Sequence, residues 1–331
     1  MYKLICNGSD VIYNSNTLSW NSDIDTLGTQ LSFDSIKDLK EGLVVSLFNG
    51  SRELIRGIIL KKTIRNSYYS YVVQDYSFYL KNEIRIEFNG TSASSAISSI
   101  LNKAYIKGDI CNLPTKITDR YCDEIGNIIN KILETSEKDQ GTKYFKEIDV
   151  NVLKIRRLYD MKINPKIYIA KDFDVESSIE NMKNKIEVIG NEENNKSLLA
   201  KAEATGMQYF YGILSKIEKV SAENIAQAKN IANNLLNDLN VIERSTTIPV
   251  VAFEGADDIK ANRMIYINSG VLCGYYKIKS ANHSLVKGLH KVDLGIDWKV
   301  KVWIMVLEWL NYLMIEIIYL NNFQYLEQLS V

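Results

Sequence analysis

The two histidines of the chain, His283 and His290, lie in the stretch SANHSLVKGLHKVDLGIDW, which covers residues 280–298. Imidazoles can bind a metal ion or act as a general base. Residues 286–288 form a turn signal between two strand-like runs, so a hairpin would bring both side chains close together. A zinc site needs three or four ligands and a general base needs a partner, and the surrounding sequence supplies neither. We therefore predict two structural hairpin residues.

Other signatures of catalysis are missing from the sequence. It contains no Walker loop and no G-x-G-x-x-G, H-E-x-x-H or G-x-S-x-G motif. The four cysteines, Cys6, Cys111, Cys122 and Cys273, are scattered and form no C-x-x-C pair. We interpret them as small buried hydrophobic residues of a protein that folds in a reducing cytoplasm. No enzyme activity, no catalytic residue, no cofactor and no metal ion are expected.

The composition is that of a folded and electrically balanced protein. Apolar residues make up 46% of the 331 residues, and 40 Lys and Arg balance 40 Asp and Glu. With no net charge to attract phosphates, specific nucleic-acid recognition is not expected. The start, MYKLICNGSD, lacks the pattern of a signal peptide. The length predicts more than one domain.

The first 90 residues have the pattern of β-strands. YKLICNG alternates Leu4 and Cys6 with other residues and ends on an Asn-Gly turn, and GLVVSLFNGSRELIRGIILKKTIRN is two apolar runs joined at 49–51. In NSYYSYVVQDYSFYL, Tyr69 and Tyr71 share one face. These rings could stack sugars or bases, but we favour cross-strand packing. Short strands with frequent turns predict a β-domain over residues 1–90.

A helical pattern replaces the strands after Gly90. Thr91 or Ser92 can cap a helix whose apolar residues recur at the 3.6-residue period up to Ala104. A second helix is predicted from about Asp119 to Glu137, and a strand pair follows Gly141. Residues 91–165 are therefore predicted to form a small α+β domain.

Strands resume over residues 166–298, where we predict a second β-domain with one helix. MQYFYGILSKIEKV, at 207–220, is predicted to be a single long strand. Residues 221–240 then predict a helix that packs on the β-domain. Its predicted contact residues are Ile225, Ala228, Ile231, Ala232, Leu235 and Leu239. The fold class expected for the whole chain is mainly β with an α+β part.

The last 33 residues, 299–331, form an apolar C-terminal tail. Its central part, 302–320, is long enough to span a bilayer. Glu308 and Glu316 would make spanning costly, so we expect no membrane contact. We favour a helix buried against another subunit or partner over a membrane-active segment, and a disordered tail stays an alternative. The predicted partner-binding residues are Trp303, Leu307, Trp309 and Leu310.

Several stretches resemble, in the same order, the PBSX-type phage tail and R-type bacteriocin baseplate hub proteins, which are related to the late control protein D group. LSWNSDIDTLGTQLSF resembles their early Trp strand, and YVVQDYSFYLKNEIRIEFNGTSASSAISSIL resembles their passage from the first barrel into the helical domain. DEIGNIINKILETSEKDQGTKYF and YFYGILSKIEKVSAENIAQAKNIANNLLNDLN are similar to two of their helical segments. GYYKIKSANHSLVKGLHKVDLGI resembles their closing hairpin. The resemblance covers about residues 1–298.

This resemblance implies two tube-like β-barrel domains, at 1–90 and 166–298, flanking the small α+β domain. It further implies a homotrimeric symmetry adaptor that joins a hexameric tail tube to a trimeric spike. The tail tube protein, the spike or tip protein and other baseplate proteins are the implied partners, and DNA or ejected protein would pass through the lumen. The expected location is the baseplate of a virion or a phage-tail-like particle, assembled in the host bacterial cytoplasm. The alternative is a tail-associated cell-wall-acting or carbohydrate-binding protein.

Overall fold

The computed structural model describes residues 1–24, 28–157, 161–169, 171–190, 197–220, 225, 227–286 and 288–301. The chain divides into two compact units. Among the described residues, the larger unit comprises those within 1–174 and 247–296, and the smaller comprises those within 175–246 and 297–301. The predicted domain boundaries at residues 90, 165 and 298 stay predictions.

The N-terminal strands of the larger unit form as their alternating pattern predicts. Leu4 and Cys6 are buried, and Asn7 and Gly8 have φ angles of 49° and 77°, the left-handed pair that a tight hairpin turn requires. The strands are β1 (Tyr2–Cys6), β2 (Ser9–Asp10), β3 (Ser15–Asp23), β4 (Gln30–Ser35), β5 (Val44–Asn49), β6 (Arg52–Ile64) and β7 (Tyr69–Asp75), with short 3-10 turns η1 (Ile12–Asn14) and η2 (Tyr76–Lys81).

A second group of strands in the larger unit comes from the C-terminal part of the chain. It consists of β15 (Lys162–Ile163), β16 (Ile167–Ile169), β21 (Val241–Ala252), β22 (Met264–Ser269), β23 (Leu272–Val286) and β24 (Leu289–Lys301), with a 3-10 turn η5 (Ala256–Asp258). The ends of β21 and β24 belong to the smaller unit. All of these strands but the first, β15, and the end of the last, β24, lie within residues 166–298, where strands are predicted.

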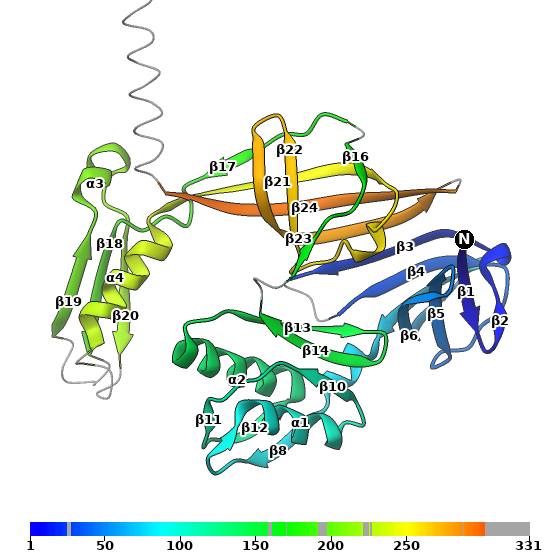
Figure 1. Cartoon of the computed structure of the whole chain (residues 1–331), viewed down its shortest axis with the longest axis horizontal. Helices are drawn as coiled ribbons and strands as arrows, with labels where there is room; N and C mark the ends of the chain where they lie inside the picture. Colours follow the sequence, from blue (N-terminus) through cyan, green and yellow to red (C-terminus); the bar gives the residue numbers. More distant parts are fainter. Residues whose placement is uncertain are drawn as a thin grey trace, which may run out of the picture. The chain divides into compact units, whose positions relative to one another are not determined.

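The two groups, together with β17 (Glu176–Ser178), which pairs with β21, form one 14-stranded sheet that curls into a half-barrel (Figure 1). Its main order is β16-β21-β24-β23-β3-β4-β7-β6-β5-β1-β2, so the strand pairing that joins the groups is the antiparallel pair β3–β23. In this pair Trp20 lies opposite His283 and Asp23 lies opposite Ser280. The mainly β class is confirmed. The closure of two separate tube-like barrels stays a prediction.

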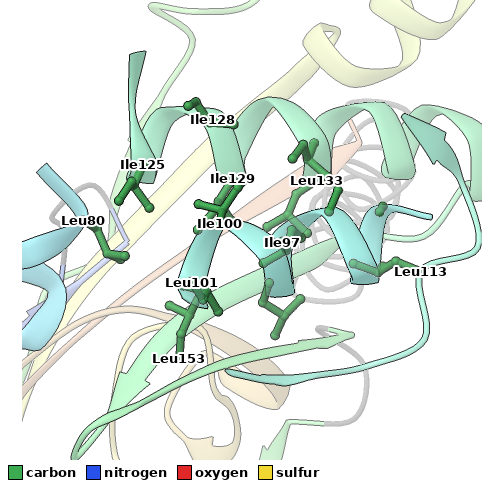
Figure 2. Close-up of a cluster of buried hydrophobic side chains, with 14 of the residues drawn as sticks. Leu80, Ile97, Ile100, Leu101, Leu113, Ile125, Ile128, Ile129, Leu133 and Leu153 are labelled. Atoms are coloured by element: carbon green, nitrogen blue, oxygen red, sulfur yellow. The ribbon is translucent and has the colours of Figure 1, made fainter. Parts of the chain in front are cut away.

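The segment between the two strand groups is α+β, as predicted. Ser92 caps the first helix by accepting a hydrogen bond from the Ser95 amide, and Gly141 ends the second at a φ of 64°. The apolar faces of the two helices pack together over a shared core (Figure 2). The elements are β8 (Glu83–Glu87), β9 (Thr91–Ser92), α1 (Ala93–Lys103), β10 (Lys107–Ile110), β11 (Lys116–Ile117), β12 (Arg120–Glu124), α2 (Ile125–Gln140), β13 (Tyr144–Asp149) and β14 (Val152–Arg157).

The predicted start of the second helix, near Asp119, is wrong. Residues 120–124 form strand β12, which pairs with β8, and α2 begins at Ile125. The buried ring of Tyr121 packs edge-on against Phe88 at a centroid distance of 6.2 Å. Because of this cross-strand contact, the five residues 120–124 belong to a strand, although their apolar periodicity alone would place them in the helix.

The smaller unit contains a three-stranded sheet of order β19-β18-β20. The predicted long strand over 207–220 is wrong, because its first residues form a helix that packs Met207 and Tyr211, one turn apart, near buried Met182. Gly212, at a φ of 71°, separates this helix from the strand that follows. The elements are β17 (Glu176–Ser178), β18 (Lys185–Gly190), β19 (Leu198–Glu203), α3 (Thr205–Tyr211), β20 (Ser215–Val220) and α4 (Ala228–Leu239).

The predicted helix over 221–240 corresponds to α4, which is described from Ala228. It packs on the three-stranded sheet: Ala228 and Ala232 are buried, and Leu235 and Leu239 are partly buried. Ile225, predicted to be a contact residue, is 44% exposed because it lies before the first residue of α4. The predicted face is thus correct within the described helix.

Replacing Leu235 by alanine should lower the free energy of unfolding by about 1–3 kcal/mol, because a partly buried leucine loses contacts that the sheet cannot refill. The matched control is Lys229→Ala on the exposed side of the same helix, which should change stability by less than about 0.5 kcal/mol. Urea unfolding of both variants measures the difference. Equal losses would contradict the assigned face.

Gly57 marks a close approach of β6 to β7. A methyl group there would lie 2.3 Å from the carbonyl oxygen of Gln74 in the paired strand. Gly57→Ala should therefore destabilise the protein by about 1–3 kcal/mol, since the backbones must separate. Gly206→Ala in α3 meets no atom within 4 Å and should be neutral or stabilising by up to about 1 kcal/mol. Thermal unfolding tests the pair, and a harmless Gly57→Ala would show that the register is wrong.

Candidate functional site

The two histidines lie on neighbouring strands, β23 and β24, as the hairpin interpretation predicts. Gly288, at a φ of 79°, stands just before β24 and permits the turn. Nδ1 of His283 and Nε2 of His290 are 2.7 Å apart, a hydrogen-bonding distance. Both side chains are buried, with 2% and 7% of their surfaces exposed. The hairpin therefore brings the imidazoles into direct contact.

A line of hydrogen bonds continues from both ends of the histidine pair. Nε2 of His283 donates to the carbonyl oxygen of Ile259 over 2.8 Å. At the other end, Nδ1 of His290 is 2.9 Å from the hydroxyl of Tyr2, and that hydroxyl is 2.9 Å from Oδ1 of Asp257. The amide of Asn49 donates to the other oxygen of Asp257 over 2.8 Å. We call the side chains of Tyr2, Trp20, Asp257, His283 and His290 the histidine cluster.

Trp20 completes the histidine cluster from β3. Its ring stacks on His283 with a centroid distance of 4.8 Å and an interplanar angle of 9°, and lies 5.2 Å from the ring of His290. Tyr2 packs edge-on against His290 at 5.7 Å. The cluster thus fastens β1 and β3 to β23, β24 and the turn η5.

Burial controls the ionisation of the cluster. It lowers the pKa of His283 to about 3, with the neighbouring His290 and Lys260 acting in the same direction. Burial also lowers the pKa of His290, against the opposing charge of Asp257. The pKa of Tyr2 is raised, first by burial and then by Asp257. Both imidazoles are therefore neutral at pH 7.

The cluster holds strands together, because each of its polar atoms named above is within hydrogen-bonding distance of another protein atom. Among the described residues, no group of three or more His, Cys, Asp or Glu side chains could share a metal ion. The imidazole nitrogens point at one another instead of toward a common centre. That the histidines are structural stays a prediction.

A separate cavity of about 620 Å³ lies in the larger unit, between β3, η2, α2 and β13. Lys146 lies on its wall, where burial lowers the pKa of the ammonium group to about 8 and its Nζ donates to the carbonyl of Gly126 over 2.8 Å. Nearby, Arg263 binds both oxygens of Glu147 at 2.7 Å. Lysines and carboxylates both line the cavity, so its charge favours neither an anion nor a cation.

The tyrosines that could have stacked sugars differ in burial: Tyr71 is buried, Tyr69 and Tyr76 are partly buried, and Tyr68 and Tyr79 are exposed. Tyr71 is buried and packs against Phe33 at a centroid distance of 5.1 Å. Its hydroxyl donates to the carbonyl of Lys37 and accepts from the amide of Leu39. The cross-strand packing interpretation is the correct one for this ring.

The predicted partner-binding residues Trp303, Leu307, Trp309 and Leu310 lie outside the described residues. Within the described part, no helix is long and apolar enough to cross a membrane. Sequence reasoning found both histidines but missed Tyr2 and Asp257, which come from positions 255 residues apart. It also missed Lys146, whose sequence neighbours give no sign of its burial.

The sequence matches a known protein family, and the fold is similar to that of several solved structures. A family model described as YQBQ-like matches residues 18–297. A search of curated proteins gave no match. Among solved structures, the fold is similar to a 43 kDa tail protein of prophage MuSo2 from Shewanella oneidensis, with a TM-score of 0.67 and 11% identity over 89% of this chain and 97% of the other.

Two further structures share the fold. A tail protein from Neisseria meningitidis MC58 matches with a TM-score of 0.65 and 12% identity over 90% of this chain and 96% of the other. Prophage tail protein gp18 from Listeria monocytogenes EGD-e matches with a TM-score of 0.55 and 11% identity over 94% and 99%. At these identities the likeness is one of fold, and it extends over nearly the full length of each relative. The family match spans more than half of the sequence, including both histidines, and the chain belongs to the YQBQ-like family.

Proposed function

We propose that this chain is a structural baseplate hub of a contractile phage tail or a phage-tail-like bacteriocin. The observation that carries the proposal is the pairing of β3 with β23, by which strands from both sides of the α+β segment enter one sheet. The fold shared with prophage tail proteins and the family membership support the same class. The role is a mechanical one, and we assign no catalytic step to it.

The proposed task is to adapt one symmetry to another. A chain with two strand-rich parts can present two similar β-bodies, so three copies would present six. Such a ring could match a hexameric tail tube on one side and a trimeric spike on the other. Edge strands that pair or pack against the next subunit would also be protected from aggregation. The two tube-like barrels belong to this proposal.

The proposed partners follow from that position. They are two further copies of this chain, the tail tube protein, the spike or tip protein and other baseplate proteins. The particle would be a virion or a phage-tail-like bacteriocin assembled in the host bacterial cytoplasm. We propose that Trp303, Leu307, Trp309 and Leu310 in the tail contact one of these proteins.

Copy number tests the proposal most simply. Quantitative mass spectrometry of purified particles should find this chain at half the number of tube subunits in one tube ring, and image reconstruction should show a three-fold ring with an open channel. Six copies per ring would contradict the adaptor role, because each chain would then match one tube subunit. Absence of the chain from purified particles would contradict the baseplate location.

A further inference from the structure

The histidine cluster contains one hydrogen too few for its contacts. A backbone carbonyl carries no hydrogen, so Nε2 of His283 must be protonated to donate to Ile259. In a neutral ring Nδ1 of His283 is then an acceptor, and Nε2 of His290 must donate to it. The remaining nitrogen of His290 is an acceptor as well. The single hydrogen of the Tyr2 hydroxyl therefore faces two acceptors, His290 and the Asp257 carboxylate.

One added proton satisfies this arrangement without moving a heavy atom. If it binds to Nδ1 of His290, that nitrogen donates to the oxygen of Tyr2, and the Tyr2 hydroxyl donates to Asp257. Each of the four contacts in the line then contains one hydrogen. The positive imidazolium would also lie near the ring of Trp20, at a centroid distance of 5.2 Å, which is within the range of cation–π contacts.

A second added proton finds no nitrogen in the pair at which it can form a hydrogen bond. It would have to bind to Nδ1 of His283, which faces the N–H of His290 over 2.7 Å. Two hydrogens would then occupy one short gap, and two positive rings would touch inside a buried site. Such a contact breaks, because like charges in a medium of low polarity repel strongly.

The charged groups around the pair come from several elements. Asp257 in η5 is the carboxylate that faces His290 through Tyr2 of β1. Its neighbour Asp258 is engaged by Arg52 of β6 at 2.6 Å. Lys260 disfavours a charge on His283 and lies 3.6 Å from Asp149 of β13. Asp257 is thus the one carboxylate near the pair, and it can balance the charge of one added proton but not of two.

We propose that the histidine cluster is an acid-labile joint that holds β1 and β3 to the hairpin β23–β24 at neutral pH, accepts one proton, and opens when the second imidazole is protonated. The joint fastens residues that lie up to 288 positions apart in the chain. Its opening would free the hairpin end at His283 from Trp20, while the rest of β23 stays paired with β3.

The pKa directions give the sign of the expected pH dependence. Both imidazoles have a pKa below 6.5 in the folded chain and near 6.5 when unfolded. The unfolded chain therefore binds more protons below pH 6.5, and stability is lost as the pH falls toward the folded-state values. The chain has two histidines, and both are in the cluster, so imidazole titration reports on nothing else.

The test uses the full chain and follows urea unfolding between pH 6 and pH 5, above the range of ordinary carboxylates. The unfolding constant of the unaltered protein should rise by at least about tenfold over this pH unit, because the unfolded chain binds two protons where the joint binds at most one. The double variant His283→Gln/His290→Gln should lose this rise. The control Asn282→Ala, at an exposed position of the same strand, should keep it.

An equal pH dependence in the double variant and the unaltered protein would overturn the proposal. A second measurement needs no variant and decides the matter if the double variant fails to fold. In protein whose histidines carry nitrogen-15, NMR at pH 7 should show both rings protonated at Nε2 and unprotonated at Nδ1. Two rings that titrate independently near pH 6.5 in the folded chain would also overturn it.

Discussion

The pairing of β3 with β23 is the contact on which the larger unit depends. It joins strands that are about 260 residues apart in the sequence, and without it the sheet would separate into an N-terminal and a C-terminal part. Such a distant pairing costs much chain entropy and forms slowly in comparison with local contacts. The α+β segment between the two strand groups has its own core.

The histidine cluster lies at this contact and makes it specific. Trp20 stacks on the residue directly opposite in the register, and a one-residue slip would turn His283 away from both Trp20 and His290. The same buried polar contacts that define the register also make it sensitive to protonation, since a neutral imidazole is part of the fit.

Local patterns predicted much of this fold, and distant contacts account for what they missed. The Asn-Gly turns, the Ser92 cap, the Gly141 end and the two histidines in one hairpin are all encoded by neighbouring residues. The strand at 120–124 was missed because its pairing partner is β8, more than 30 residues away. Tyr2 and Asp257 were missed for the same reason. Helix α3 was missed because Met207 and Tyr211 suit a strand as well as a helix, and the contacts around Met182 decide between them.

A disulfide cross-link across β3 and β23 tests the central claim, that strands from both ends of the chain meet in one sheet. Asn21 and Asn282 are exposed and lie directly opposite each other. The Cα–Cα distance between opposite residues of antiparallel strands falls within the range found in disulfides. In the variant Asn21→Cys/Asn282→Cys, mild oxidation should give an intramolecular bond that peptide mapping identifies. The control Asn16→Cys/Asn282→Cys, displaced along β3, should give none. No bond between positions 21 and 282 in the first variant would contradict the claim, whereas bonds through the exposed Cys122 or Cys273 do not bear on it.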